Sequence, residues 1–134
     1  MKIKDMQRGQ IWWFSNPQMQ PCPKDKFSIC IGSSQFLAIN TKGCYGRFKL
    51  TKKEYPFLNY DSYVGDSILD FSGEDEEIEV PNANFRQIIS DETAKQLINH
   101  VKKAPVLKKT DKDIITAALV PPFHPPIWGN QKLT

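Results

Sequence analysis

Cysteine, glycine and long apolar runs are scarce in this chain of 134 residues. Its three cysteines, Cys22, Cys30 and Cys44, are spaced by 8 and 14 residues, which fits neither a disulfide framework nor paired zinc ligands. The weakly polar stretch 114–127 contains four prolines and is shorter than the ~20 apolar residues that cross a bilayer. We therefore expect thiols without a partner, no metal site and no contact with a membrane.

Signals for secretion and for several enzyme classes are also missing. Residues 1–10 are charged and polar, without the apolar stretch of a signal peptide, so we expect a cytoplasmic protein. No glycine-rich phosphate loop, metal-ligand cluster or serine elbow occurs. His100 is interpreted as a structural residue near a helix end, and His124 has no partner in the pattern. We expect no cofactor.

The charged residues of this chain are unevenly distributed. A content of 40% hydrophobic and 25% charged residues is typical of a globular protein, and the length fits one domain. The net charge is only +3, but residues 1–60 carry +7, residues 61–95 carry −8 and the remainder carries +4. A basic surface made by the first half would attract phosphate. The alternative is a mixed surface on which this segregation averages out after folding.

Short strands dominate the predicted structure. Aromatic and β-branched runs separated by Gly, Pro and Asn predict strands at 10–15, 27–31, 35–40, 44–50, 62–71 and 84–89. Ser90 as N-cap and apolar residues at helical spacing predict a helix that Pro105 ends, and a second short helix is expected at 111–119. The fold class is mainly β: a small barrel of five to six short strands with a packed C-terminal helix and a Pro-rich tail. The expected boundaries are 1–104 for barrel plus helix and 105–134 for the extension.

Four stretches, in order, resemble the PemK/MazF family of toxin proteins. They are an Arg-Gly opening strand, an aliphatic second strand, a third strand that ends in threonine, and a closing strand with a Ser-led helix: 8–14, 26–31, 36–42 and 85–101. The resemblance implies an SH3-like barrel. It also implies a homodimer that binds single-stranded RNA in a groove across the dimer and cleaves it without a metal. An antitoxin protein would block that groove.

The resemblance further implies two catalytic positions. The family places an arginine at the head of the second strand and a Thr or Ser at the end of the third, and the matching residues here are Lys26 and Thr41. RNA cleavage needs a base for the ribose 2′-OH, a cation or donor for the phosphate, and an acid for the leaving oxygen. Lysine offsets phosphate charge but lacks the planar fork of arginine. Lys24 is an alternative if the register slips.

Further RNA contacts are predicted at Lys24, Lys42, Arg47 and Lys49. In a regular strand, Arg47 and Lys49 would share a face with Tyr45, which gives a basic and aromatic row suited to phosphate contact and base stacking. A solvated face is the alternative. Trp12 and Trp13 point to opposite faces of one strand, so we expect one in the core and one at a binding or dimer contact. Arg8 is interpreted as a surface or loop-anchoring residue.

Two functions without catalysis compete with the nuclease hypothesis. One is a non-catalytic SH3-like module that binds nucleic acid or a protein partner. In this hypothesis, Lys26-Phe27 in place of the family's Arg-Pro reflects lost catalysis. The other is a structural or phage-type accessory protein whose tail mediates assembly. The five prolines and the aromatic residues of 105–134 would let this tail dock on the barrel, on a dimer mate or on another protein. A tail that covers the basic groove is a further alternative.

Overall fold

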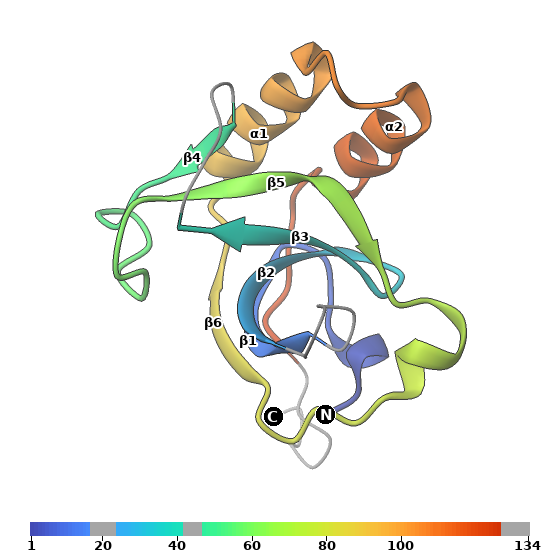
Figure 1. Ribbon diagram of the computed structural model, residues 1–134. Helices are drawn as coiled ribbons and strands as arrows, with labels where there is room; N and C mark the ends of the chain where they lie inside the picture. Colours follow the sequence, from blue (N-terminus) through green and yellow to red (C-terminus); the bar gives the residue numbers. More distant parts are fainter. Residues whose placement is uncertain (17–23, 42–46, 127–134) are drawn as a thin grey trace.

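A six-stranded antiparallel sheet, curled into a half-barrel, forms the body of the molecule (Figure 1). The computed structural model describes residues 1–16, 24–41 and 47–126. The strand order is β4-β5-β3-β2-β1-β6. The strands are β1 (Gln10–Asn16), β2 (Lys24–Gly32), β3 (Gln35–Asn40), β4 (Phe48–Leu50), β5 (Ser62–Asp70) and β6 (Asn84–Ile88). The prediction of a mainly β fold with this number of short strands is confirmed.

Strand bounds differ from the predicted ones mainly in β2. This strand begins at Lys24, three residues before the predicted start, because Lys24 to Lys26 pair with Asn16 to Phe14 of β1. Lys26 therefore lies inside the β1–β2 ladder. The predicted fourth strand is described only from Phe48 onward, and its residues 44–46 lie outside the described residues.

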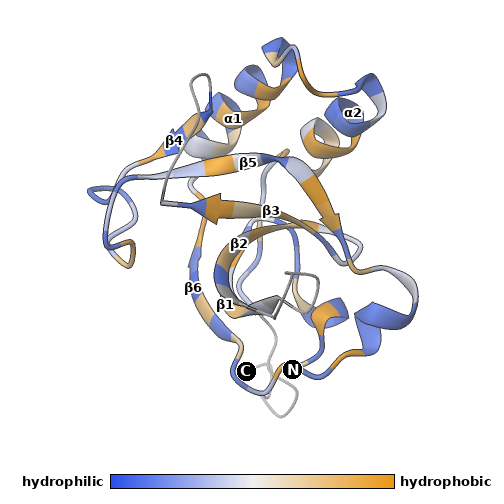
Figure 2. Cartoon of the chain, viewed as in Figure 1, coloured by the Kyte–Doolittle hydropathy of each residue, from blue (hydrophilic) through white to orange (hydrophobic). Residues whose placement is uncertain are grey.

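Two buried clusters pack on opposite faces of the curled sheet. Successive residues of a strand point to opposite faces, and the pairs Ile11/Trp12 and Phe36/Leu37 divide between the clusters in this way. One cluster lies under the helices. The other is covered by the short 3-10 helices η1 (Ile3–Asp5) and η2 (Gly73–Glu77). Figure 2 shows hydrophobic residues along β3 and part of β5, and both hydrophobic and hydrophilic residues along α1 and α2. Trp12 is fully buried, so it is the predicted core tryptophan.

Two helices cover one side of the sheet: α1 (Asp91–Lys103) and α2 (Lys109–Ala118). The predicted N-cap is confirmed, since the Ser90 side chain accepts a hydrogen bond from Thr93 N at 3.0 Å. Ile115 and Leu119 are buried in the cluster that also holds Leu97 of α1. The segment after residue 104 therefore contributes to the main core. Within the described ranges, neither helix is long and apolar enough to span a membrane.

The chain that follows α2 docks on the start of β1. The Arg8 guanidinium donates hydrogen bonds to the carbonyl oxygens of Ala118 at 3.1 Å, Val120 at 2.5 Å and Pro122 at 2.9 Å. Its carbon lies 5.3 Å from the centre of the Phe123 ring. The buried Gln10 amide donates to the carbonyl oxygen of His124 at 2.9 Å. Arg8 thus anchors the tail, and residues 118–124 dock on the barrel of their own chain.

Candidate functional site

Five chain segments meet at one end of the sheet. Because β5, β3, β2 and β1 are consecutive antiparallel neighbours in the sheet, the end of β1, the start of β2, the end of β3 and the start of β5 lie together. The start of β6 joins them, since Asn84 pairs with Trp13 near the end of β1. Residues that are far apart in the sequence are therefore neighbours at this end of the half-barrel.

A pocket of about 460 Å³ opens at this end. It is lined by two cations, several aromatic rings and aliphatic side chains, two amides and two hydroxyl groups. These residues are Trp13, Lys26, Phe27, Ile39, Thr41, Leu58, Asn59, Tyr60, Ser62, Asn84 and Arg86. We call it the strand-end pocket. It contains both residues that the sequence predicts as catalytic, Lys26 and Thr41.

Lys26 and Thr41 reach the pocket from neighbouring strands. Lys26 is half-buried in β2, and its ammonium donates a hydrogen bond to Asn40 Oδ1 at 2.9 Å. Asn40 is the last residue of β3, and the exposed Thr41 follows it directly. The Lys26–Asn40 bond therefore holds the ammonium beside the chain segment that carries the Thr41 hydroxyl. This hydrogen bond leaves two of the three donors of the ammonium for another acceptor.

Arg86 is a pocket residue that the sequence analysis does not single out. Ile11 pairs with Gln87 and Trp12 pairs with Phe85, so Arg86 is the extra residue of an irregularity in the β1–β6 ladder. Bulges of this kind re-aim a side chain. The Arg86 guanidinium lies 5.6 Å from the centre of the Phe57 ring. The only hint in the sequence is the alternation in 84–88, which places Asn84 and Arg86 on the same, more exposed face of the strand. No pattern in the sequence predicts the bulge.

Aromatic rings give this pocket surfaces on which a base can stack. Trp13 is half-buried, and its ring centre lies 4.4 Å from that of Phe27. Phe27 in turn lies 5.0 Å from Phe57. The side chain of Tyr60 at the rim is 68% exposed. Trp13 is thus the tryptophan that faces a candidate binding site, whereas its neighbour Trp12 lies in the core.

The combination of these side chains fits a single-stranded nucleic acid. An ammonium and a guanidinium neutralise phosphate, aromatic rings stack on bases, and amides and hydroxyls hydrogen-bond to base edges or ribose. Among the lining residues that the structure describes, there is no carboxylate and no imidazole. The described part of the chain also has no group of three or more His, Cys, Asp or Glu that could hold a metal ion.

The other predicted RNA contacts do not converge on the strand-end pocket. Lys42 lies outside the described residues, as does the side chain of Lys24. Arg47 lines a separate, largely apolar pocket of about 370 Å³ and forms an ion pair with Asp66 at 3.4 Å. Lys49 forms an ion pair with Asp61 at 3.4 Å. The predicted basic row is therefore partly neutralised by aspartates of the β5 region.

Comparison with models of protein families, with curated proteins and with solved structures found no match. What can be inferred about this site therefore comes from its own side chains and their arrangement.

Proposed function

We propose that this protein is a PemK/MazF-like endoribonuclease with an SH3-like barrel, which binds single-stranded RNA in the strand-end pocket and cleaves it without a metal ion. The observation that carries the proposal is that Lys26 of β2 and Thr41, which directly follows β3, line the same pocket together with Arg86. The homodimer, the antitoxin and the cytoplasmic location that the resemblance implies remain predictions.

Five of the pocket residues have a role in the proposed reaction. The ribose 2′-oxygen attacks the adjacent phosphorus, the bond to the 5′-oxygen breaks, and the products are a 2′,3′-cyclic phosphate and a 5′-hydroxyl. The proton of the 2′-OH leaves with solvent, and solvent returns one to the leaving oxygen. Lys26 and Arg86 offset the charge that develops on the phosphate, and the Thr41 hydroxyl donates a hydrogen bond to a phosphate oxygen. Trp13 and Tyr60 hold the neighbouring bases.

The test is cleavage of a long unstructured RNA by the purified protein in the presence of a metal chelator. We expect cyclic-phosphate ends for the wild type. Loss of one preorganised donor costs about 10²- to 10³-fold in rate, so we expect Lys26→Ala and Arg86→Ala to fall by this factor. Thr41→Ala should also lose activity. Thr41→Ser keeps the hydroxyl and should therefore keep most of the wild-type activity.

Matched controls carry the same chemical changes away from the pocket. Lys4→Ala removes an exposed lysine that pairs with Glu77, and Thr110→Ala removes an exposed hydroxyl of α2. Both should cleave like the wild type. Equal cleavage by Lys26→Ala, Arg86→Ala and Lys4→Ala would refute the assignment of the pocket.

A non-catalytic RNA-binding module is the second candidate function. The observation in its favour is that the described lining has cations and aromatic rings but neither a carboxylate nor an imidazole as a proton acceptor. If the wild type binds RNA and Lys26→Ala weakens this binding, while no cleavage occurs with or without a chelator, the module describes the protein and the nuclease does not.

A further inference from the structure

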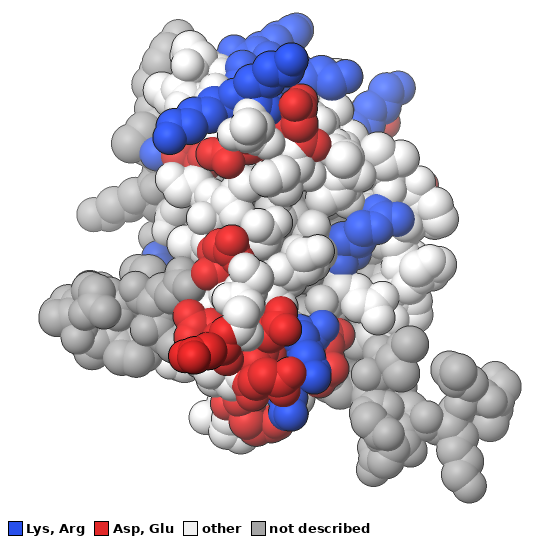
Figure 3. Space-filling model, turned by 90° about the vertical axis from the view of Figure 1, so that its right-hand side faces the viewer, with Lys and Arg blue, Asp and Glu red and all other residues white. Residues whose placement is uncertain are grey.

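Lysine side chains gather on the two helices, at the opposite pole from a cluster of carboxylates. Residues 95–110 contain five lysines and no Asp or Glu. All five are exposed: Lys95, Lys102, Lys103, Lys108 and Lys109. Figure 3 shows most of the basic side chains in this view over the helices at the top of the molecule, with some acidic side chains beside them, and a larger acidic group lower down. We call the five lysines the lysine face.

These lysines differ from the basic residues at the acidic pole in their partners. Lys2 and Lys4 both form ion pairs with Glu77, at 3.0 and 2.8 Å. Among the residues that the structure describes, no carboxylate lies within ion-pair distance of any lysine of the lysine face. Lys112 lies beside this face, because its ammonium donates a hydrogen bond to the carbonyl oxygen of Lys102 at 3.3 Å. It adds a further positive charge. The face therefore presents to solvent ammonium groups that form no ion pair within the described ranges, and Asp111 and Asp113 of α2 follow it closely in the sequence.

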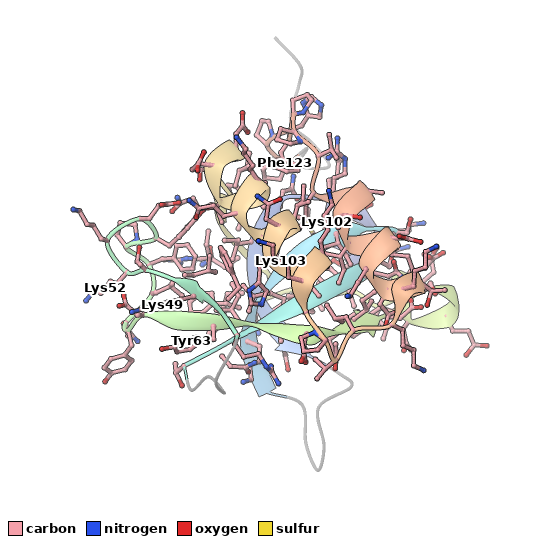
Figure 4. All side chains as sticks on the ribbon, turned by 90° about the horizontal axis from the view of Figure 1, so that it is seen from above. Lys49, Lys52, Tyr63, Lys102, Lys103 and Phe123 are labelled. Carbon is pink, nitrogen blue, oxygen red and sulfur yellow. The ribbon has the colours of Figure 1, made fainter. Side chains whose placement is uncertain are left out.

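A series of contacts leads from the strand-end pocket to α1 by way of Lys49 and its ion-pair partner Asp61. Tyr60 at the pocket rim is followed by Asp61, which accepts a hydrogen bond from Lys52 N at 2.8 Å and pairs with the Lys49 ammonium. The neighbour of Lys49, Phe48, lies 5.7 Å from His100 of α1, measured between ring centres. Figure 4, a view from above, shows Lys49 and Lys52 at the edge of the molecule and Lys102 and Lys103 on α1 nearer its centre.

We propose that the lysine face binds the phosphate backbone of the same RNA whose bases enter the strand-end pocket, with Lys49 and Lys52 between the two. This inference rests on the proposed RNA binding of the pocket. The exposed Lys49–Asp61 pair is weak enough for a phosphate to compete with it. Because ammonium groups on long side chains contact phosphate without reading base edges, the face adds affinity without sequence preference.

The salt dependence of RNA binding tests this inference. The probe is an unstructured oligonucleotide with 2′-O-methyl riboses, which cannot be cleaved through the 2′-oxygen. Each phosphate contact with a single strand contributes a slope of about −0.7 to log K against log salt. Lys102→Ala/Lys103→Ala should therefore make the slope shallower by about 1.4. That slope difference corresponds to about 25-fold weaker binding at 0.1 M salt, and it should be equal for oligonucleotides of different sequence.

The control is Lys2→Ala/Lys4→Ala, which removes the same charge at the acidic pole and should leave the slope unchanged. Alanine is the best helix former, so the double variant in α1 keeps its fold, and circular dichroism checks this. Equal slopes for the wild type and Lys102→Ala/Lys103→Ala would overturn the inference. If Lys26→Ala still weakens binding in that case, the pocket proposal survives. A wild type that does not bind the probe refutes both.

Two other partners of a lysine face are tested in parallel. Phosphatidylserine vesicles report binding to an anionic lipid surface, and light scattering against protein concentration reports head-to-tail association of the two poles. If either signal depends on Lys102 and Lys103 while the RNA slope does not, the face serves that partner and the inference is wrong. A change in the RNA slope without either signal supports it.

Discussion

The two ends of β1 both have cationic side chains, but the cations are used differently. At the start of the strand, the Arg8 guanidinium donates to three carbonyl oxygens of the tail and packs on Phe123. Toward its other end, Lys26 of the neighbouring β2 has one hydrogen bond to a side chain. Arg86 of β6, which the bulge opposite Ile11 and Trp12 positions, lies over an aromatic ring and lines the same open pocket. One cation is held by three hydrogen bonds to its own chain, and two line a space that an external phosphate can enter.

This difference agrees with the interpretation of Arg8 as an anchoring residue. Arg8–Gly9 begins the stretch that resembles the toxin family, yet it holds the C-terminal segment in place. The tail docks at the end of the sheet opposite the strand-end pocket, so residues 118–124 do not cover that pocket. Experiments on the two ends must therefore separate effects on stability at one end from effects on RNA at the other.

The largest expected effect is on stability, from Gly9→Ala. Gly9 has a φ of +85°, and a Cβ there would lie 2.4 Å from atoms of the Phe123 ring. Both the backbone strain and the displacement of the tail cost free energy, so we expect the free energy of unfolding to fall by about 3 kcal/mol, measured by urea titration.

Gly73→Ala is the matched control for this substitution. Gly73 has a φ of +83°, but a Cβ added there would have no atom within 4 Å. It should therefore cost only the backbone strain, about 1 kcal/mol. Equal losses for the two variants would show that Phe123 does not pack against Gly9 in solution.

Arg8→Ala should lower stability and Lys26→Ala should lower RNA affinity. Arg8→Ala removes three charge-assisted hydrogen bonds, so it should lower the free energy of unfolding by about 2 kcal/mol and leave RNA affinity unchanged. Lys26→Ala should change stability by less than about 0.5 kcal/mol and weaken RNA binding. Urea titration and binding of the 2′-O-methyl oligonucleotide measure the two quantities. A folded Arg8→Ala protein that loses RNA affinity would break the comparison between the two ends.

A smaller effect is expected from pH at the start of α1. Hydrogen bonds from Thr93, and then from Ser90 and Tyr55, hold the pKa of the Glu54 carboxyl below its usual range. The carboxylate therefore adds stability above the ordinary glutamate pKa of about 4.3, and this is lost as the pH falls through the lower folded pKa. Because Glu54 is exposed, we expect at most about 1 kcal/mol.

Glu54→Gln removes the titrating group and keeps the shape of the side chain. The variant should be less stable than the wild type at neutral pH, and the gap should close as the pH is lowered toward ~3, below the ordinary glutamate pKa. Chemical denaturation at a series of pH values measures both. A gap that stays constant with pH would mean that the charge of Glu54 does not stabilise this helix end.

Local patterns in the sequence were sufficient to predict most elements. Aromatic and β-branched runs between turn residues placed the strands, and Ser90 with its downstream apolar residues placed α1, because these signals depend on near neighbours. The early start of β2 at Lys24 depends on pairing with β1, which is a long-range property that periodicity does not encode.

The candidate site was only partly predictable for the same reason. Lys26 and Thr41 were found through a resemblance, and the antiparallel order of the strands brings both to one pocket. Arg86 was missed because a bulge in the β1–β6 ladder positions it. Arg47 and Lys49 were grouped by their spacing, and the aspartates that pair with them come from a distant part of the chain.

The buried Gln10 has a consequence for the evolution of such chains. Its Oε1 accepts from Gln7 N and Trp12 Nε1, both at 2.9 Å, while its Nε2 holds the carbonyl oxygen of His124. A glutamate at this position would keep both acceptor contacts but would have no hydrogen to give to the His124 carbonyl oxygen. Chains that keep this C-terminal segment should therefore vary together at two places: an amide at position 10 and a docked peptide beyond α2.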